Sequence, residues 1–215
     1  MLFDSYLKDI PKLHTWDEGT TWNSGGFEDY HLRAFYKYVT AGARRVIETG
    51  AGNSSLAFLF GQPDCLTTIA PERELFDRID TFARENSLTT SAWEQLIDRS
   101  EWALPVLAQN GREYDLALID GGHGWPTVFV DFCYINVMLA RDGILIIDDV
   151  QLHSIKELGK LLKADTARFK FLESLGKSKV FQKKTNEKFL PEWTEQPYIR
   201  QKSDSYVGSH DRFEI

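Results

Sequence analysis

The hydrophobic residues of the chain form short continuous runs that alternate with longer amphipathic segments. Continuous apolar runs cover residues 116–119 and 144–147, which is typical of parallel strands that are covered by helices on both faces. Between such runs, apolar residues recur at helical spacing, as Ile155, Leu158 and Leu162 do. Strands that alternate with helices predict an α/β fold with a doubly wound, mostly parallel sheet.

The same pattern sets the expected element boundaries. Residues 141–143 read as a turn, and the chain from residue 185 onward reads as polar and irregular. Helices are expected at about residues 27–38, 54–60, 73–86, 126–140 and 151–164. Strands are expected at residues 45–47, 65–70, 93–97, 114–119, 144–147, 169–172 and 179–182.

Three regions follow from this layout. Residues 1–44 form an aromatic-rich N-terminal cap with one helix, residues 45–184 form the ligand-binding domain, and residues 185–215 form a tail. We expect the loop around Trp16 and Trp22 to fold over the active site as part of a lid. In the tail, Trp193, Tyr198 and Tyr206 suggest docking, either on a partner subunit or over the site.

The stretch RVIETGAGNSS, which begins at Arg45, joins a strand to a helix through a glycine turn. Gly50 and Gly52 allow the tight turn, and Ser54 is a good residue for a helix start. A dinucleotide-binding turn needs a third glycine, but Ser55 stands at that position. Glu48 would repel a pyrophosphate and favour a cationic group such as an amino-acid ammonium, so an NAD-linked oxidoreductase is disfavoured.

This stretch resembles motif I of the class I S-adenosylmethionine-dependent methyltransferases, E/D-x-G-x-G-x-S. A second segment, from Asp120 to Asp149, reads D-G-x-H, a helix, and then G-I-L-I-I-D-D. It is similar to the cation-dependent O-methyltransferases of the catechol type and to related antibiotic-tailoring enzymes. Together the resemblances cover about residues 45–150. They imply a seven-stranded Rossmann-like sheet whose last two strands pair as an antiparallel hairpin around Gly176.

The resemblance also implies where S-adenosylmethionine binds. The expected contacts of the glycine turn are Glu48, Gly50, Ala51, Gly52 and Ser54.

Further contacts are expected from the next strand ends. An acidic residue after the second strand binds ribose hydroxyls in doubly wound nucleoside sites, and Glu72 has a suitable position, with Glu74 as the alternative. The family loop that borders the adenine corresponds to Ser100, beside which Trp102 is a candidate aromatic wall. Asp120 completes the expected cofactor contacts.

Three carboxylates at two strand ends suggest a metal. Asp120, Asp148 and Asp149 follow apolar strands whose ends share one edge of the sheet. Hard oxygen ligands suit Mg²⁺, which in the resembling enzymes binds the acceptor hydroxyls and lowers their pKa. The alternative is that these aspartates cap the helices that follow.

Histidines follow both of these strand ends. His123 suits proton removal from an acceptor hydroxyl, or a contact that positions the cofactor, and His153 is the alternative base. Neither His14 nor His31 carries a signal of its own.

Composition narrows the function further. The 215 residues suit one α/β domain, and the net charge of -7 argues against a general nucleic-acid binder. No apolar run approaches membrane-spanning length, and the start of the chain lacks a signal-peptide layout. A cytoplasmic location is therefore expected, and the resemblance implies a small-molecule partner, with homo-oligomer formation left open. Cys65 and Cys133 have no C-x-x-C partner, so reduced, mostly buried thiols are expected.

These observations predict direct methyl transfer to an oxygen of a small molecule, with Mg²⁺ assistance in one version. Two alternatives remain open at this point. One is a metal-independent methyltransferase that acts on nitrogen or oxygen. The other is a non-catalytic cofactor-binding or assembly protein, because Ala70 and the pair Asp98-Arg99 depart from the family pattern.

Overall fold

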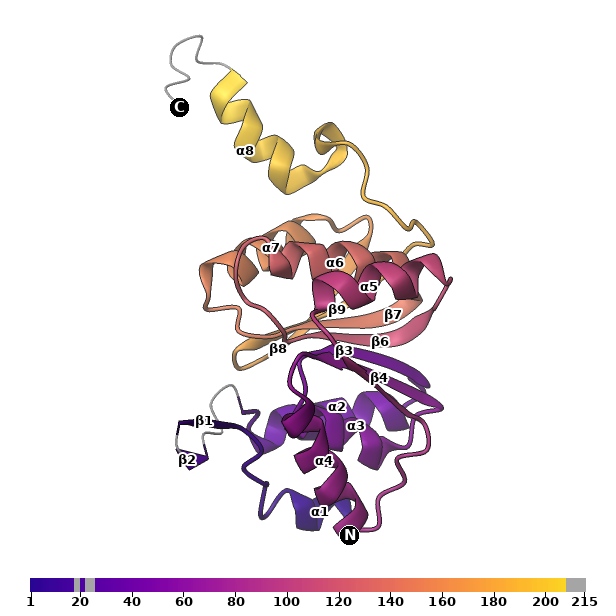
Figure 1. Ribbon diagram of the computed structural model, residues 1–215. Coiled ribbons are helices and arrows are strands. Elements are labelled where there is room, and N and C mark those ends of the chain that lie inside the picture. The colour runs from indigo at the N-terminus through magenta and orange to yellow at the C-terminus, as the bar shows by residue number, and fades with distance from the viewer. Residues whose placement is uncertain (18–19, 22–25, 208–215) are drawn as a thin grey trace.

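The structure is a computed structural model that describes residues 1–17, 20–21 and 26–207. Its centre is a seven-stranded sheet between two layers of helices (Figure 1). The predicted doubly wound α/β fold is therefore confirmed.

The sheet is parallel except at one edge. In the order β5-β4-β3-β6-β7-β9-β8, the strands from β5 to β7 are parallel, and β9 is antiparallel to both neighbours. The order reverses between β3 and β6, which is where a doubly wound sheet opens a crevice for a ligand. The strands are β3 (Arg45–Thr49), β4 (Cys65–Ala70), β5 (Trp93–Ile97), β6 (Tyr114–Ile119), β7 (Leu139–Ile147), β8 (Phe169–Leu175) and β9 (Ser178–Lys183).

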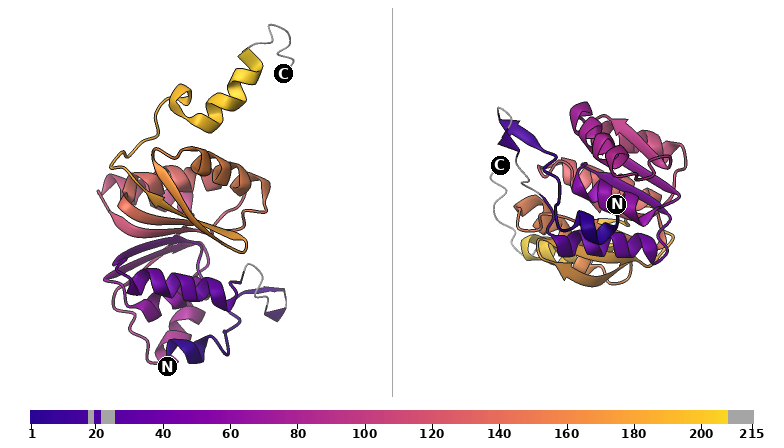
Figure 2. Two further views of the ribbon diagram at one scale, coloured as in Figure 1. Left: turned by 180° about the vertical axis from the view of Figure 1, so that it is seen from behind. Right: turned by 90° about the horizontal axis from the view of Figure 1, so that it is seen from below.

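Helices cover both faces of the sheet and bury an apolar layer against each (Figures 1 and 2). Leu32, Phe58 and Phe76 fill one layer, and Leu104 and Phe132 belong to the other. Burial of this much apolar surface is the dominant favourable contribution to folding. One face carries α2 (Asp29–Thr40), α3 (Asn53–Gly61) and α4 (Arg73–Glu85), and the other carries α5 (Ser100–Gln109), α6 (Thr127–Met138) and α7 (His153–Ala164).

The strand β7 begins earlier than the sequence pattern predicts. The predicted turn at residues 141–143 belongs to this strand, because Tyr114 already pairs with Leu139 before the register shifts. Asp142 absorbs the irregularity with a φ of 66°, in the left-handed region that aspartate tolerates better than most residues. The turn residues therefore mark a bulge inside a strand and not its start.

The last two strands form the predicted antiparallel hairpin. Phe171 pairs with Phe181, and Leu175 pairs with Ser178 across the turn. Gly176 has a φ of 53° in this turn, a conformation that glycine adopts without a steric penalty.

The tail contains a helix that the sequence pattern did not predict. The 3₁₀ turn η1 (Trp193–Glu195) leads into α8 (Pro197–Val207), which stands off the end of the molecule nearest α7 (Figures 1 and 2). Tyr198 anchors this helix by donating its hydroxyl hydrogen bond to Glu157 of α7. Proline is well suited to a helix start, but the polar composition of this segment hid the helix.

The N-terminal region lies beside α3 and α4 and holds α1 (Phe3–Tyr6), β1 (Thr15–Asp17) and β2 (Thr20–Thr21). Trp22, which belongs to the predicted lid, lies outside the described residues, as do the side chains of Trp16 and Tyr206.

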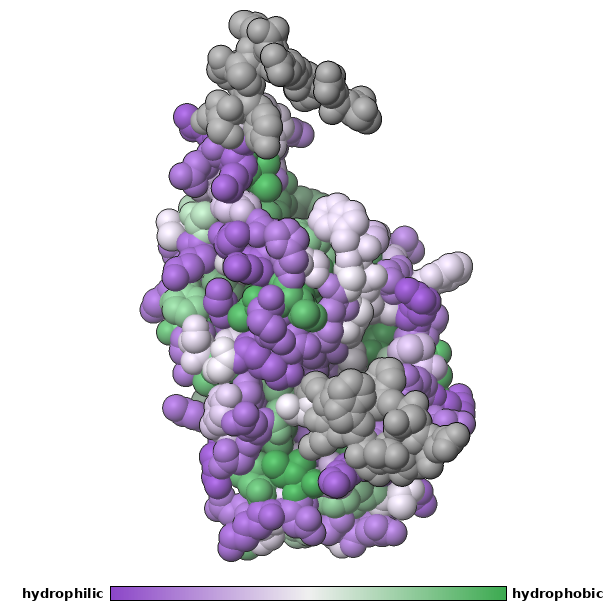
Figure 3. All heavy atoms as spheres, turned by 90° about the vertical axis from the view of Figure 1, so that its left-hand side faces the viewer, coloured by the Kyte–Doolittle hydropathy of each residue, from purple (hydrophilic) through white to green (hydrophobic). Residues whose placement is uncertain are grey.

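The face of the molecule in Figure 3 is mostly hydrophilic, with small hydrophobic areas. Both cysteines are free, but Cys65 is half-buried and Cys133 is exposed on α6, so the expectation of mostly buried thiols was wrong. Among the described residues, no helix has the length and hydrophobicity needed to cross a membrane.

Candidate active site

A cavity of about 510 Å³ opens at the carboxyl edge of the sheet, where the strand order reverses. Its size lies within the ~300–1,000 Å³ that small-molecule sites usually have. Seven of the residues that the sequence suggested line it: Gly50, Ala51, Glu72, Ser100, Asp120, His123 and Asp149.

The glycine turn after β3 brings two strand ends into contact. Gly50 has a φ of 89°, and a Cβ at this position would lie 2.4 Å from the carbonyl oxygen of Asp120. No side chain fits there, so only glycine lets the turn lie against the end of β6. Ser55, at the place of the missing third glycine, accepts a hydrogen bond from the backbone N–H of Gly52 at 3.1 Å. The hydroxyl therefore caps α3 in a way that a glycine could not.

Glu48 lies beneath this turn and not among the residues that line the cavity. It is fully buried, and its two carboxylate oxygens accept hydrogen bonds from Ser54 at 2.6 Å and Thr68 at 2.8 Å. Burial raises the pKa of Glu48 to about 7, although the hydroxyls of Ser54, Ser55 and Thr68 act in the opposite direction. Glu48 would therefore affect a bound ligand indirectly, by holding the glycine turn in place.

The far end of the cavity is formed by the start of α5. Ser100 and Glu101 line it, and Glu101 accepts hydrogen bonds from Thr127 at 2.7 Å and from Arg99 at 3.1 Å. The hydrogen bonds from Arg99 and Thr127 lower the pKa of Glu101 to about 2. Trp102 points elsewhere, since its side chain is 71% exposed and does not line the cavity.

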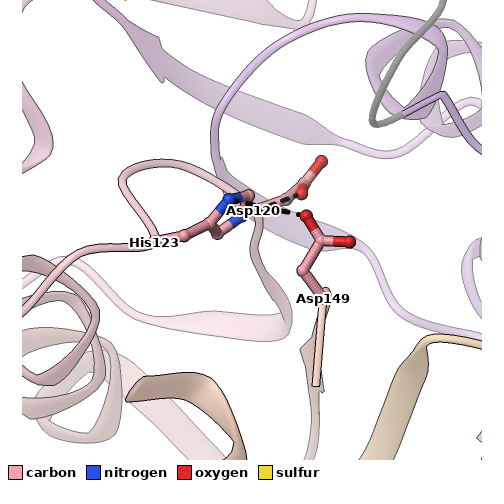
Figure 4. A group of neighbouring side chains, drawn as sticks. All are labelled: Asp120, His123 and Asp149. Atoms are coloured by element: carbon pink, nitrogen blue, oxygen red, sulfur yellow. Dashed lines mark ion pairs between the residues drawn. The ribbon is translucent and has the colours of Figure 1, made fainter. Parts of the chain in front are cut away.

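Asp120, His123 and Asp149 converge at the near end of the cavity (Figure 4). The Nε2 atom of His123 lies 3.5 Å from Oδ1 of Asp120, and its Nδ1 atom lies 3.4 Å from Oδ2 of Asp149. The interaction with Asp120 raises the pKa of His123, and burial raises the pKa of Asp120. An imidazole between two carboxylates is stabilised in its protonated form, as a proton acceptor requires.

Asp149 is held in an unusual conformation. Its φ is 54°, in the left-handed region, and strained backbone of this kind is common at functional sites. Burial tends to raise the pKa of Asp149, but Gln151 and Lys177 outweigh burial and lower it. Both donate hydrogen bonds to Oδ1, at 2.9 and 3.0 Å, which leaves Oδ2 facing His123.

Asp148 points away from the cavity into the β8–β9 hairpin. It is fully buried, accepts a hydrogen bond from Ser178 and forms an ion pair with Lys177 at 2.7 Å. A buried carboxylate needs this compensation. The Lys177 ammonium therefore stands where the sequence suggested a metal beside Asp148 and Asp149.

The structure also separates the two candidate bases. His123 lines the cavity, whereas His153 is exposed at the first turn of α7 and does not line it. The remaining predicted contacts, Gly52 and Ser54, are buried beside the turn without lining the cavity.

A divalent cation fits the acidic end with a changed ligand set. One oxygen each from Asp120 and Asp149 and one nitrogen from His123 lie within 4.8 Å of one another. A mixed nitrogen and oxygen set is less suited to Mg²⁺ than to metals that accept imidazole.

Two residues near the cavity have no sequence signal. His14 lines it from the N-terminal segment. Asp131, which is fully buried on α6, faces Thr49 and Ser100, and burial raises its pKa to about 6 despite their hydroxyls. Both lie outside the recognised motifs, because the contacts that define them come from elements distant in sequence.

The comparisons with known proteins agree with the fold. Residues 47–150 match the family model of a methyltransferase domain. The comparison with curated proteins returns no match. Among solved structures, an O-methyltransferase of tomaymycin synthesis from Streptomyces achromogenes, in complex with S-adenosylmethionine, has a TM-score of 0.64 at 16% identity, covering 74% of this chain and 82% of its own.

Two further structures are similar to the same extent. An O-methyltransferase from Bacillus cereus, in complex with S-adenosylhomocysteine, has a TM-score of 0.63 at 15% identity and covers 75% of this chain and 84% of its own. A Podospora anserina methyltransferase bound to S-adenosylhomocysteine has a TM-score of 0.61 at 14% identity, with 75% and 81% covered. At these levels of sequence identity, the similarity to these structures is evidence for a shared fold only.

Proposed function

We propose that this chain is a class I S-adenosylmethionine-dependent methyltransferase, because residues 47–150 match the family model of a methyltransferase domain, and that it transfers the methyl group to an oxygen atom of a small molecule. The observation that carries this proposal is the placement of His123 between Asp120 and Asp149 at one end of the cavity. That end offers a proton acceptor beside a site for a hydroxyl group.

The cofactor would lie along the cavity from the glycine turn to the start of α5. Gly50 and Ala51 would face its amino-acid part, Glu72 its ribose hydroxyls, and Ser100 its adenine. The lining carries more acidic than basic side chains, which favours a cationic sulfonium ligand. The O-methyltransferases from Streptomyces achromogenes and Bacillus cereus were solved with S-adenosylmethionine and its demethylated product, which supports the same ligand here.

His123 would act as the general base. Its imidazole takes the proton of the acceptor hydroxyl, and the oxygen attacks the methyl carbon as the carbon–sulfur bond breaks. The electron pair of that bond goes to sulfur, which leaves neutral S-adenosylhomocysteine. Asp120 and Asp149 hold the imidazole and stabilise the imidazolium, while alignment of the two substrates supplies much of the rate.

A divalent metal is the second version of this mechanism. Asp120, His123 and Asp149 would hold the ion, which would lower the pKa of the acceptor hydroxyl as a Lewis acid. Activity that survives exhaustive chelation would favour the version in which His123 works alone. Activity that is lost on chelation and restored by one added divalent metal would favour the metal version.

The test compares the two histidines that follow the strand ends. Release of S-adenosylhomocysteine is measured with a panel of small phenols, catechols and alcohols as acceptors, and cofactor affinity is measured by calorimetry. We expect His123→Gln to lower kcat by about 100-fold or more with little change in the Kd for S-adenosylhomocysteine.

His153→Gln is the matched control and should leave both quantities unchanged. The proposal fails if the wild-type chain binds neither S-adenosylmethionine nor S-adenosylhomocysteine. The assignment of the base fails if His153→Gln abolishes turnover and His123→Gln does not.

A further inference from the structure

The N-terminal segment is fixed across the glycine turn by hydrogen bonds to α3 and α4. Tyr6 donates its hydroxyl hydrogen bond to the backbone oxygen and to Oδ1 of Asn53, at 3.1 and 3.0 Å. Asn53 in turn donates from Nδ2 to the carbonyl oxygen of Pro11 at 3.0 Å. Arg78 of α4 donates from Nε to the carbonyl oxygen of Leu13 at 2.5 Å. The backbone just before His14 is therefore held at both helices.

This anchoring presses His14 against the glycine turn. The Nε2 atom of His14 lies 2.9 Å from the position that a Cβ at Gly52 would occupy, and its ring lines the cavity. A Cβ atom at this position would force the imidazole to move, so Gly52 provides the space that the ring occupies here. The two positions are complementary although they are far apart in sequence.

His14 also faces the end of β4. Glu72, which follows this strand, lines the same cavity and interacts electrostatically with His14. Burial lowers the pKa of His14, so its imidazole is neutral at pH 7 and offers one N–H donor and one nitrogen acceptor. The cavity wall between the glycine turn and β4 thus carries a neutral imidazole and a carboxylate.

We propose that His14 binds the ribose of the cofactor, and that His14 and Glu72 hold the two ribose hydroxyls between them. The wall between the first helix start and the second strand end is where the ribose lies in doubly wound nucleoside sites. Each ribose hydroxyl can both donate and accept a hydrogen bond. It can therefore donate to the Glu72 carboxylate, and it can accept from or donate to the neutral imidazole of His14. This inference rests on the proposed function, because it takes S-adenosylmethionine as the ligand.

The test measures the binding of two ligands to His14→Ala by calorimetry. Both ligands carry adenine and ribose, but S-adenosylhomocysteine also has an amino-acid part, which 5′-methylthioadenosine lacks. Loss of one hydrogen bond in a partly buried site corresponds to about a three- to tenfold rise in Kd. We expect this rise for both ligands, and a smaller rise for His14→Gln, because glutamine keeps a donor and an acceptor.

Lys12→Ala, two residues earlier and exposed, is the matched control and should leave both Kd values unchanged. A rise for S-adenosylhomocysteine alone would overturn the ribose assignment and place His14 at the amino-acid end. Unchanged Kd values for both ligands in a folded His14→Ala variant would overturn the inference while leaving the proposed function intact. If the wild-type chain binds neither ligand, the proposed function fails and this inference fails with it.

Discussion

At the scale of single residues, the glycine turn rests on a carboxyl group that does not line the cavity. Glu48 is fully buried and is surrounded by hydroxyl groups of Ser54, Ser55 and Thr68. Hydroxyl groups can donate to a carboxylate and can also accept from a carboxylic acid. The hydrogen bonds of Glu48 can therefore form in both of its protonation states. A change of pH alters the stability of the turn but does not remove these hydrogen-bond partners.

Glu48 makes the free energy of unfolding pH-dependent. Its pKa is about 7 in the folded chain against an ordinary value of 4.5, so its contribution to stability is complete below about pH 4.5 and is lost as the pH rises through 7. Relative to Glu48→Gln, the wild-type free energy of unfolding should fall by up to ~3 kcal/mol between pH 4.5 and pH 8.

Urea titrations of both proteins at the two pH values measure this difference. Glu85→Gln, which changes an exposed glutamate of α4, serves as the control. A wild-type and Glu48→Gln difference that stays constant with pH would contradict the assignment.

Gly50 tests the contact between the turn and the end of β6. Alanine there faces both a φ of 89° and the carbonyl oxygen of Asp120 at 2.4 Å, so we expect Gly50→Ala to lower the free energy of unfolding by about 2–3 kcal/mol. Gly111→Ala is the matched control, because Gly111 has a φ of 68° with nothing within 4 Å. It should show only the backbone strain, about 1–2 kcal/mol. Equal losses in thermal melts would show that the close contact contributes nothing.

At the scale of secondary-structure elements, the β8–β9 hairpin supports the acidic end of the cavity from outside. Lys177, in its turn, forms ion pairs with Asp148 at 2.7 Å and with Asp149 at 3.0 Å. The hairpin thus supplies a fixed positive charge to two adjacent carboxylates on the loop after β7. Asp148 is needed to hold the hairpin, and Asp149 is free to face His123.

Removing this charge should destabilise the hairpin and the site together. Lys177→Met leaves the buried Asp148 carboxylate with Ser178 as its remaining partner, so we expect a loss of about 2–3 kcal/mol in the free energy of unfolding. Lys170→Met, on the exposed side of β8, is the control and should change stability by less than about 0.5 kcal/mol. Denaturant titrations at pH 8 compare the two. A loss no larger for Lys177→Met than for the control would show that the ion pairs contribute nothing to stability.

At the scale of the whole molecule, the part of the tail from residue 192 onward is expected to be separable from the rest of the chain. Among the described residues, none after Pro191 lines the cavity or joins the buried core. The helix α8 is held to α7 through Tyr198 and Glu157. The expected partner docking of this segment remains a prediction.

Deletion of residues 192–215 should lower the free energy of unfolding by less than about 1 kcal/mol. The melting temperature should therefore stay within about 3 °C of the full chain. The Kd for S-adenosylhomocysteine should stay within twofold. Thermal melts and calorimetry measure both, and light scattering of the two chains at equal concentration tests homo-oligomer formation. A chain that fails to fold or bind after the deletion would contradict the separation of the tail.

The sequence was most informative where structure is locally encoded. The strands β4 and β5 have the predicted bounds, because a short β-branched or apolar run between turn residues has few other ways to be buried. The bulge in β7 and the helix α8 were missed for the opposite reason. Their local residues favour turns and loops, and only pairing with β6 or packing on α7 overrides that preference.

The sequence by itself determined the order of the seven strands along the chain, the glycine turn, and the arrival of Asp120 and Asp149 at one edge of the sheet. These follow from local periodicity and from the rule that parallel strands end at the same edge. Only the tertiary structure decided which neighbouring carboxylate faces the cavity, which cation balances the other, and that His14 meets the glycine turn. Such choices depend on contacts between elements far apart in the chain, and local propensity carries no information about them.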